Sequence, residues 1–119
     1  MNHVQVGDIG EQVAAEYLRE AGYHILAKKY RCKIGEIDII AQVSNMIVFV
    51  EVKTRRSTGY GFPAEAVTYR KQQKIMNVAL CYLKQMNQNH VACRFDVIEI
   101  FLTGEDVVKY NHIIDAFSK

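Results

Sequence analysis

Two strongly apolar stretches, separated by a short turn, constrain the fold of this chain most. Residues 36–43 (EIDIIAQV) and 46–54 (MIVFVEVKT) are rich in Ile, Val and Phe, which favour β-strands. Ser44-Asn45 stands between them, and asparagine tolerates the positive φ that tight hairpins require. The pattern therefore predicts an antiparallel hairpin closed by this turn, in a register that a four-residue loop would keep and a bulge would break.

The polar residues of this predicted hairpin are not scattered. Because strand side chains alternate between faces, Glu36, Asp38 and Ile40 share one face of the first strand, and Phe49, Glu51 and Lys53 share one face of the second. The register places Asp38 opposite Glu51 and Glu36 opposite Lys53. Opposed residues have Cβ atoms about 4.5–5.5 Å apart, so two like charges there need neutralising.

Two interpretations of these charges remain open. Hard carboxylate oxygens of Asp38 and Glu51 at such a separation suit Mg²⁺ or Mn²⁺. Alternatively, Glu36, Asp38, Glu51 and Lys53 form a cross-strand network of ion pairs on a solvated face.

The rest of the chain predicts one mixed sheet flanked by helices. We expect a helix over 8–21, from Asp8 as N-cap to a stop at Gly22, and a second helix over about 68–86. Strands are expected over 23–31, 91–102 and 107–115, and a loop over 55–64, which holds the only proline. The order α-β-β-β-α-β-β predicts an α/β (α+β) fold, and the absence of linkers or repeats favours a single domain over 1–119.

Glu11 has two possible roles. Asp8-x-x-Glu11 fits a capping box, which is a purely structural use of these residues. At about 100° per residue, however, Glu11 falls on the rim of the apolar stripe of the first predicted helix, within reach of the sheet on which it packs.

Composition and charge bound the possible environments. The net charge of +2 does not by itself demand a nucleic-acid partner, although basic residues gather before Phe95 and acidic ones after it. No run of about 18 apolar residues predicts a membrane span, and the N-terminus does not predict a signal peptide. The cysteines Cys32, Cys81 and Cys93 are far apart in sequence and odd in number, which is typical of reduced thiols in a cytoplasmic protein. The four histidines show no ligand spacing.

The chain resembles the core of PD-(D/E)xK nucleases. The two halves of that motif correspond to "GEIDII", which contains Asp38, and to "VFVEVKTR", which contains Glu51-Val52-Lys53. Glu51 follows Asp38 by thirteen positions, and Ile37 stands where a proline is common. The upstream "GDIGEQVAAEYLREAGYHIL" is similar to the first helix of archaeal Holliday junction resolvases. The bacterial YraN-like family resembles the chain over about residues 7–102, including "YRCKIGEIDIIA" and "VFVEVKTRRSTGYGFPAEAV". The resemblance implies a restriction-endonuclease-like fold.

It also implies a site and an activity. Asp38 and Glu51 would be the metal-binding acids, with Glu11 and the backbone carbonyl of Val52 completing the site for Mg²⁺ or Mn²⁺. Lys53 would be the motif lysine that orients the attacking water. The expected activity is that of a metal-dependent endonuclease acting on DNA, with branched or single-stranded DNA in recombination, repair or uptake as candidate substrates. The oligomeric state stays open, although the resemblance to resolvases, which are dimers, would be compatible with a homodimer. The alternatives are a nucleic-acid-binding module with little turnover and an interaction protein.

Basic and aromatic residues near the motif are candidates for nucleic-acid contact. Arg55 and Arg56 directly follow Lys53 and favour contact with the DNA backbone. Lys71 and Lys74 on the second predicted helix either contact phosphate or form a solvated face. Tyr60 and Phe62 either stack on a base or anchor their loop.

Overall fold

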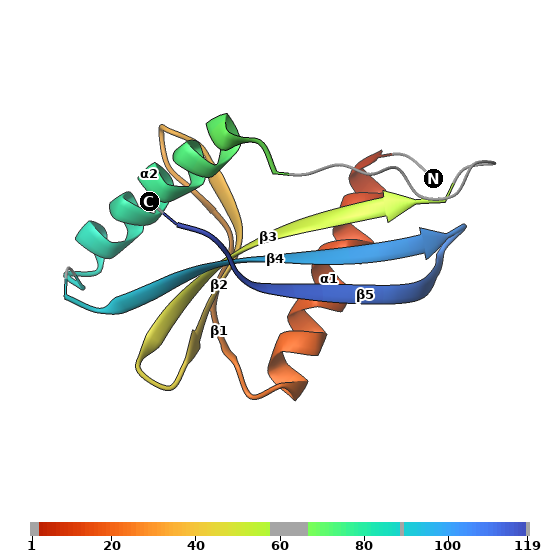
Figure 1. Cartoon of the computed structure of the whole chain (residues 1–119), viewed down its shortest axis with the longest axis horizontal. Helices are drawn as coiled ribbons and strands as arrows, with labels where there is room; N and C mark the ends of the chain where they lie inside the picture. The colour runs from red at the N-terminus through yellow and green to blue at the C-terminus, as the bar shows by residue number, and fades with distance from the viewer. Residues whose placement is uncertain (1–2, 58–66, 89, 119) are drawn as a thin grey trace.

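A five-stranded mixed sheet and two helices make up the part of the chain that the computed structural model describes, which is residues 3–57, 67–88 and 90–118. The element order α-β-β-β-α-β-β confirms the prediction (Figure 1). The elements are α1 (His3–Glu20), β1 (His24–Arg31), β2 (Glu36–Val43), β3 (Met46–Arg56), α2 (Tyr69–Gln85), β4 (Ala92–Thr103) and β5 (Asp106–Phe117).

The strands lie in the sheet in chain order, β1-β2-β3-β4-β5. The β3–β4 pair is parallel, and the other three pairs are antiparallel. A parallel pair needs a crossover connection, and α2 lies in that connection. The predicted hairpin register is confirmed from Val43–Met46 to Ile39–Val50. Ser44, with φ of 53°, adopts the positive φ in the turn.

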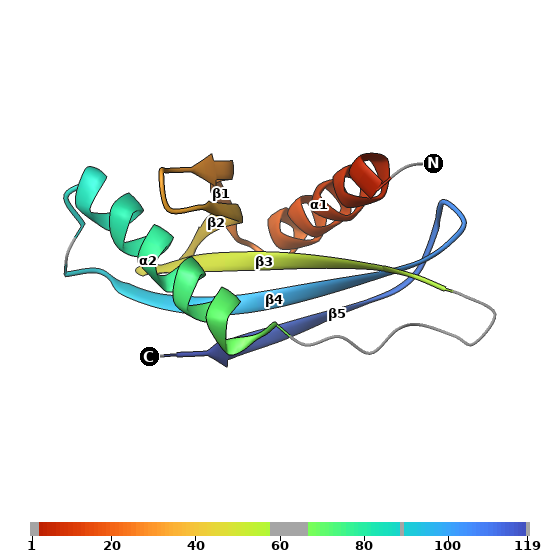
Figure 2. The same ribbon diagram turned by 90° about the horizontal axis from the view of Figure 1, so that it is seen from above.

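Each helix covers one face of the sheet. One cluster of buried side chains joins α2 to Ile40, Phe49 and their neighbours. The other joins α1 to Ala41, Val48 and their neighbours. Because adjacent residues of β2 and of β3 fall into different clusters, the two helices lie on opposite faces. Along the longest axis, α2 lies toward one end and α1 toward the other (Figure 2).

The first helix begins earlier than predicted. It starts at His3, so Asp8 and Glu11 both lie inside it. The prediction of Asp8 as N-cap is wrong, and so is the capping box, one of the two roles left open for Glu11. Its end is as predicted: Gly22 has φ of 92°, and the Tyr23 N–H donates to the Leu18 carbonyl. No helix within the described ranges is long and apolar enough to span a membrane.

The boundaries around α2 also differ from the prediction. β3 continues to Arg56, because parallel pairing with β4 runs on to Arg56–Leu102, so Arg55 and Arg56 are strand residues and not loop residues. Thr68 caps α2, and its side chain accepts a hydrogen bond from the Lys71 N–H at 3.2 Å. Tyr60 and Phe62 lie outside the described residues.

Candidate functional site

A pocket of about 270 Å³ lies where β2, β3 and the two helices meet. It brings together six of the residues predicted from sequence, from four separate elements. They are Glu11, Asp38, Glu51, Val52, Lys53 and Lys71, and Val6, Gly7 and Thr54 complete the lining.

The pocket exists because β2 and β3 part at this point. Their ladder ends at Ile39–Val50, one pair before Asp38 and Glu51. Beyond that pair, the Asp38 side chain bonds to the β3 backbone, since its Oδ2 accepts a hydrogen bond from the Val52 N–H at 2.8 Å. Asp38 and Glu51 are thus brought to one pocket as predicted, at an opening of the sheet rather than on a continuous ladder.

The predicted alternation of side chains fails at Asp38. Ile37 packs in the cluster of α2, whereas Ile39 packs in the cluster of α1, so two residues expected on one face lie on opposite faces. In the neighbouring strand, Lys29 has φ of 53° and lies opposite Asp38, between the pairs Lys28–Ile39 and Tyr30–Ile37. A positive φ at a non-glycine residue is a strained conformation that clusters at functional sites.

Glu36 does not face Lys53 as expected. The ladder between β2 and β3 does not extend to these residues, and the Glu36 carboxylate instead accepts hydrogen bonds from the Arg31 guanidinium, the shorter at 2.6 Å. This pair is partly exposed, so we assign Glu36 a surface ion pair and no part in the pocket.

Lys71 bonds directly to one of the two strand acids. Its Nζ lies 3.0 Å from Oε1 of Glu51, whose side chain is only 8% exposed. Burial alone would lower the pKa of Lys71, but the attraction of Glu51 and Asp38 outweighs it and raises the pKa. The Lys71 ammonium therefore reaches the acidic site, although the side chain is 45% exposed.

Gly10 allows α1 to bring Glu11 to the same pocket. A Cβ at Gly10 would overlap Oγ1 of Thr54 on β3, so another residue here would push the helix away from the strand. Glu11 Oε1 is buried and has no hydrogen-bond partner among the described residues. Burial raises the pKa of Glu11, against the opposing effect of Lys29. An orphaned carboxylate oxygen of this kind indicates a missing cation or donor.

The acids of the pocket repel one another. Burial and then the charge of Glu51 raise the pKa of Asp38 to about 7, although the Val52 N–H opposes this shift. Glu11 adds to the repulsion and Lys71 reduces it. Asp38 therefore keeps its proton to a higher pH than an ordinary aspartate does.

The donor set suits a hard divalent cation. Within the described ranges, no three Asp, Glu, His or Cys side chains are already arranged as a metal-binding group. The chemistry nevertheless fits, because Asp38, Glu51 and Glu11 offer carboxylate oxygens, which Mg²⁺ and Mn²⁺ prefer, and one of these oxygens is orphaned. Lys71 bonds to Oε1 of Glu51, so it would compete with the cation for this carboxylate.

The raised pKa of Asp38 predicts how stability depends on pH in EDTA. In the unfolded chain Asp38 has its ordinary pKa of 3.8, so between that value and about 7 the folded protein holds more protons. The contribution of Asp38 to the free energy of unfolding is therefore fully present below pH 3.8, and it is lost as the pH rises through about 7. We expect Asp38→Asn to remove a pH-dependent difference of the order of 2–4 kcal/mol. Urea unfolding from pH 4 to 8 measures it, and parallel curves for both proteins would contradict it.

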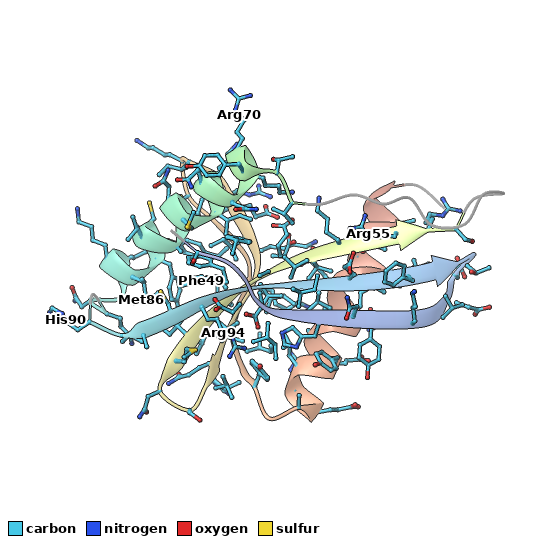
Figure 3. The ribbon with its side chains drawn as sticks, viewed as in Figure 1. Phe49, Arg55, Arg70, Met86, His90 and Arg94 are labelled. Atoms are coloured by element: carbon cyan, nitrogen blue, oxygen red, sulfur yellow. The ribbon has the colours of Figure 1, made fainter. Side chains whose placement is uncertain are left out.

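Arg55 is not placed for the DNA contact predicted from sequence. Its side chain is only 7% exposed, and its Nε donates to Oε2 of Glu99 on β4 at 2.8 Å (Figure 3). Asn111 on β5 donates to the other oxygen of Glu99 at 3.1 Å. Arg55 thus ties β3 to β4, and we leave it out of the proposed contact surface.

Arg56 and Lys74 are exposed, as a phosphate contact requires. The stem of Lys74 crosses the turn between β1 and β2: a Cβ at Gly35 would lie 3.0 Å from Lys74 Cε. Arg70, next to the pocket lysine Lys71, points away from the body of the protein (Figure 3). These residues place positive charge outside the pocket.

A second polar cluster, which the sequence did not suggest, lies under β5. Asp96 is fully buried, and its carboxylate accepts two hydrogen bonds from Arg94 at 2.8 Å each. Nε2 of His112 lies 2.7 Å from Asp96 Oδ2, and the Asp115 N–H donates to Oδ1. Burial opposes ionisation, but the bonds from His112 and Arg94 outweigh it and lower the pKa of Asp96 to about 2.

The hydrogen bonds of this network extend to Tyr17 on α1 and to Tyr23, which follows α1. Arg94 donates to the Tyr23 hydroxyl at 2.8 Å, and the Tyr17 hydroxyl lies 2.8 Å from Nδ1 of His112. His112, to which sequence gave no role, is therefore structural. The only available signal was Arg94 and Asp96 two residues apart, which puts them on one face of a strand.

Comparison with known proteins identifies the family. The pattern of "Uncharacterised protein family UPF0102" matches residues 10–100. A UPF0102 protein of Caldanaerobacter subterraneus subsp. tengcongensis is 50% identical over 98% of both chains. One from Clostridioides difficile is 48% identical, over 98% of this chain and all of its own.

The chain belongs to the UPF0102 family. This confirms the family part of the predicted resemblance, because the YraN-like proteins are the UPF0102 family. The UPF0102 match includes every acid and lysine of the pocket, from Glu11 to Lys71. The names of the UPF0102 relatives state no activity, so the function is argued from the site.

Proposed function

We propose that the protein is a metal-dependent nuclease of the PD-(D/E)xK superfamily, with a restriction-endonuclease-like fold, which hydrolyses DNA phosphodiester bonds. The observation that carries this proposal is the pocket in which Asp38, Glu51 and Lys53 meet where β2 and β3 part. Three carboxylates and two lysines around one small pocket suit the in-line attack of water on a phosphodiester.

Each pocket residue has a defined role in this proposal. Asp38, Glu51 and Glu11 would hold Mg²⁺ or Mn²⁺, together with the Val52 carbonyl. Such an ion, when bound, stabilises negative charge and lowers the pKa of its water. Lys53 orients the attacking water and stabilises charge on the phosphate. The Val52 N–H keeps the Asp38 carboxylate turned toward β3.

The substrate is proposed from the charge around the pocket. Arg56, Lys74 and Arg70 are exposed cations that can neutralise DNA phosphates, and such contacts fix the position of a strand without reading its sequence. Branched or single-stranded DNA in recombination, repair or uptake is the proposed substrate class. The proposed setting is the cytoplasm and the proposed state a homodimer.

One observation favours a second candidate. Lys71 Nζ lies 3.0 Å from Glu51 Oε1, so a cation of the chain itself already neutralises this carboxylate. A protein that kept this ion pair would be a nucleic-acid-binding module with the nuclease fold and little or no turnover.

A cleavage assay over a panel of DNA structures tests the proposal. Wild type with Mn²⁺ or Mg²⁺ should cut at least one of single-stranded, duplex, flap and four-way DNA, because all motif residues line the pocket. EDTA should stop cleavage, and Asp38→Asn should remove it together with Mn²⁺ binding in calorimetry. Binding without cleavage in either metal would favour the second candidate, and equal cleavage by Asp38→Asn would contradict the proposed site.

A further inference from the structure

Two of the three cysteines, far apart in sequence, are neighbours in the folded chain. Cys32 follows β1, and Cys81 lies in the second half of α2. Cys32 packs against the cluster of buried side chains that includes Val78 and Tyr82, which flank Cys81 on α2, and the two thiols interact. Both side chains are partly exposed. Cys93, at the start of β4, is exposed and has no part in this contact. Cys32 and Cys81 are therefore a pair of neighbouring thiols, and Cys93 is a separate, exposed one.

The turn that holds Cys32 presents its sulfur to donors. The Cys32 N–H donates to the Gly35 carbonyl at 2.9 Å, which closes the turn. The backbone N–H groups of Ile34 and Gly35 in turn donate to the Cys32 sulfur. Burial acts to raise the pKa of Cys32, but these donors and Cys81 outweigh it and lower the pKa. Thiolate is the nucleophilic form, so Cys32 is the more reactive partner.

The turn and the helix are held close by Gly35. A Cβ there would lie 3.0 Å from Lys74 Cε and 3.4 Å from Val78 Cγ2, so the turn rests directly on α2. Cys81 lies further along the same helix, where its thiol interacts with that of Cys32. Its pKa is raised by the interaction with Cys32 and by burial, so Cys81 is the less acidic of the two thiols.

We propose that Cys32 and Cys81 form a reversible intramolecular disulfide by exchange with a low-molecular-weight disulfide. The Cys32 thiolate attacks one sulfur of the small disulfide and displaces its other half as a thiolate. Cys81 then loses its proton and attacks the Cys32 sulfur, which releases the second half. Two protein thiols are oxidised to one disulfide, and the small disulfide is reduced to two thiols that take up the two protons.

The bond would fasten the β1–β2 turn to α2. It closes a long loop, from residue 32 to residue 81, and so constrains the unfolded chain strongly. Lys71 lies on the same helix and reaches Glu51, so the bond would also hold α2 beside the acidic pocket. The disulfide itself does not depend on the proposed nuclease activity.

Oxidised glutathione tests this proposal on the whole chain. After incubation of wild type and Cys93→Ser, non-reducing tryptic mapping should link peptide 32–33 to peptide 75–84 in both proteins. The midpoint of thermal unfolding should rise by about 5–15 °C and return on reduction. Cys81→Ser should instead carry glutathione on Cys32 and show no rise.

Three results would overturn the proposal. One is the absence of the linked peptides in wild type under conditions that modify Cys93. Another is a link that includes Cys93. The third is an equal rise in the unfolding midpoint for Cys81→Ser, because that variant has no partner for Cys32. Cys81→Ala serves the same purpose if Cys81→Ser does not fold.

Discussion

Lys53→Ala should lower the rate of Mn²⁺-dependent DNA cleavage by about 10²–10³, because a donor is removed from the place where negative charge develops. DNA affinity should change little, since Lys53 is one positive charge among several around the pocket, with Lys71, Lys74 and Arg56. Binding and cleavage are measured on the same substrate, chosen from the panel as one that wild type cuts.

Glu51→Gln is the matched variant for this experiment. It should also stop cleavage, but through loss of a metal ligand, so Mn²⁺ affinity should fall in Glu51→Gln and persist in Lys53→Ala. Loss of Mn²⁺ affinity in Lys53→Ala would show that the lysine acts through the metal site. Residual cleavage that is equal in wild type and both variants would identify a contaminant and leave the nuclease proposal without support.

Asp96→Asn should destabilise the protein by about 3–5 kcal/mol, the usual cost of breaking a buried ion pair on one side only. Asp96 is fully buried, and the change leaves Arg94 with no carboxylate there. Urea unfolding at neutral pH measures the loss. Glu36→Gln is the control, because its ion pair with Arg31 is partly exposed and should contribute less than about 1 kcal/mol.

The pH dependence of this variant has the opposite sign to that of Asp38→Asn. The pKa of Asp96 is lowered to about 2 by its partners, so its stabilising effect is present above the ordinary value of 3.8 and is lost as pH falls through about 2. Acid should therefore narrow the difference between wild type and Asp96→Asn. A difference that stays constant from pH 6 down to pH 2 would contradict this account of the network.

The hairpin register was predictable because it is encoded locally. Alternating apolar residues and the Ser44-Asn45 turn determine which residues of β2 and β3 face each other, and the pairs from Val43–Met46 to Ile39–Val50 follow that rule. The rule fails at Asp38, which lies opposite Lys29 with its positive φ. No local pattern marks Lys29 for a positive φ.

Features that depend on contacts between distant elements were not predictable. Arg55 looked like a surface cation, but its parallel neighbour β4 supplies Glu99, so the charge is buried and neutralised. Lys71 looked like a helix-surface lysine, but the first turn of α2 lies over Glu51. In both cases sequence identified the charge, whereas the partner followed from how strands and helices pack.

The parting of β2 from β3 has a consequence for how the two sides of the protein communicate. A continuous sheet is a partition: side chains from a helix on one face do not meet those from a helix on the other. In this protein the sheet is open between β2 and β3. Glu11 from α1 and Lys71 from α2 therefore line the same pocket, although their helices cover opposite faces. A shift of either helix would alter the charge balance at the acids that both helices share.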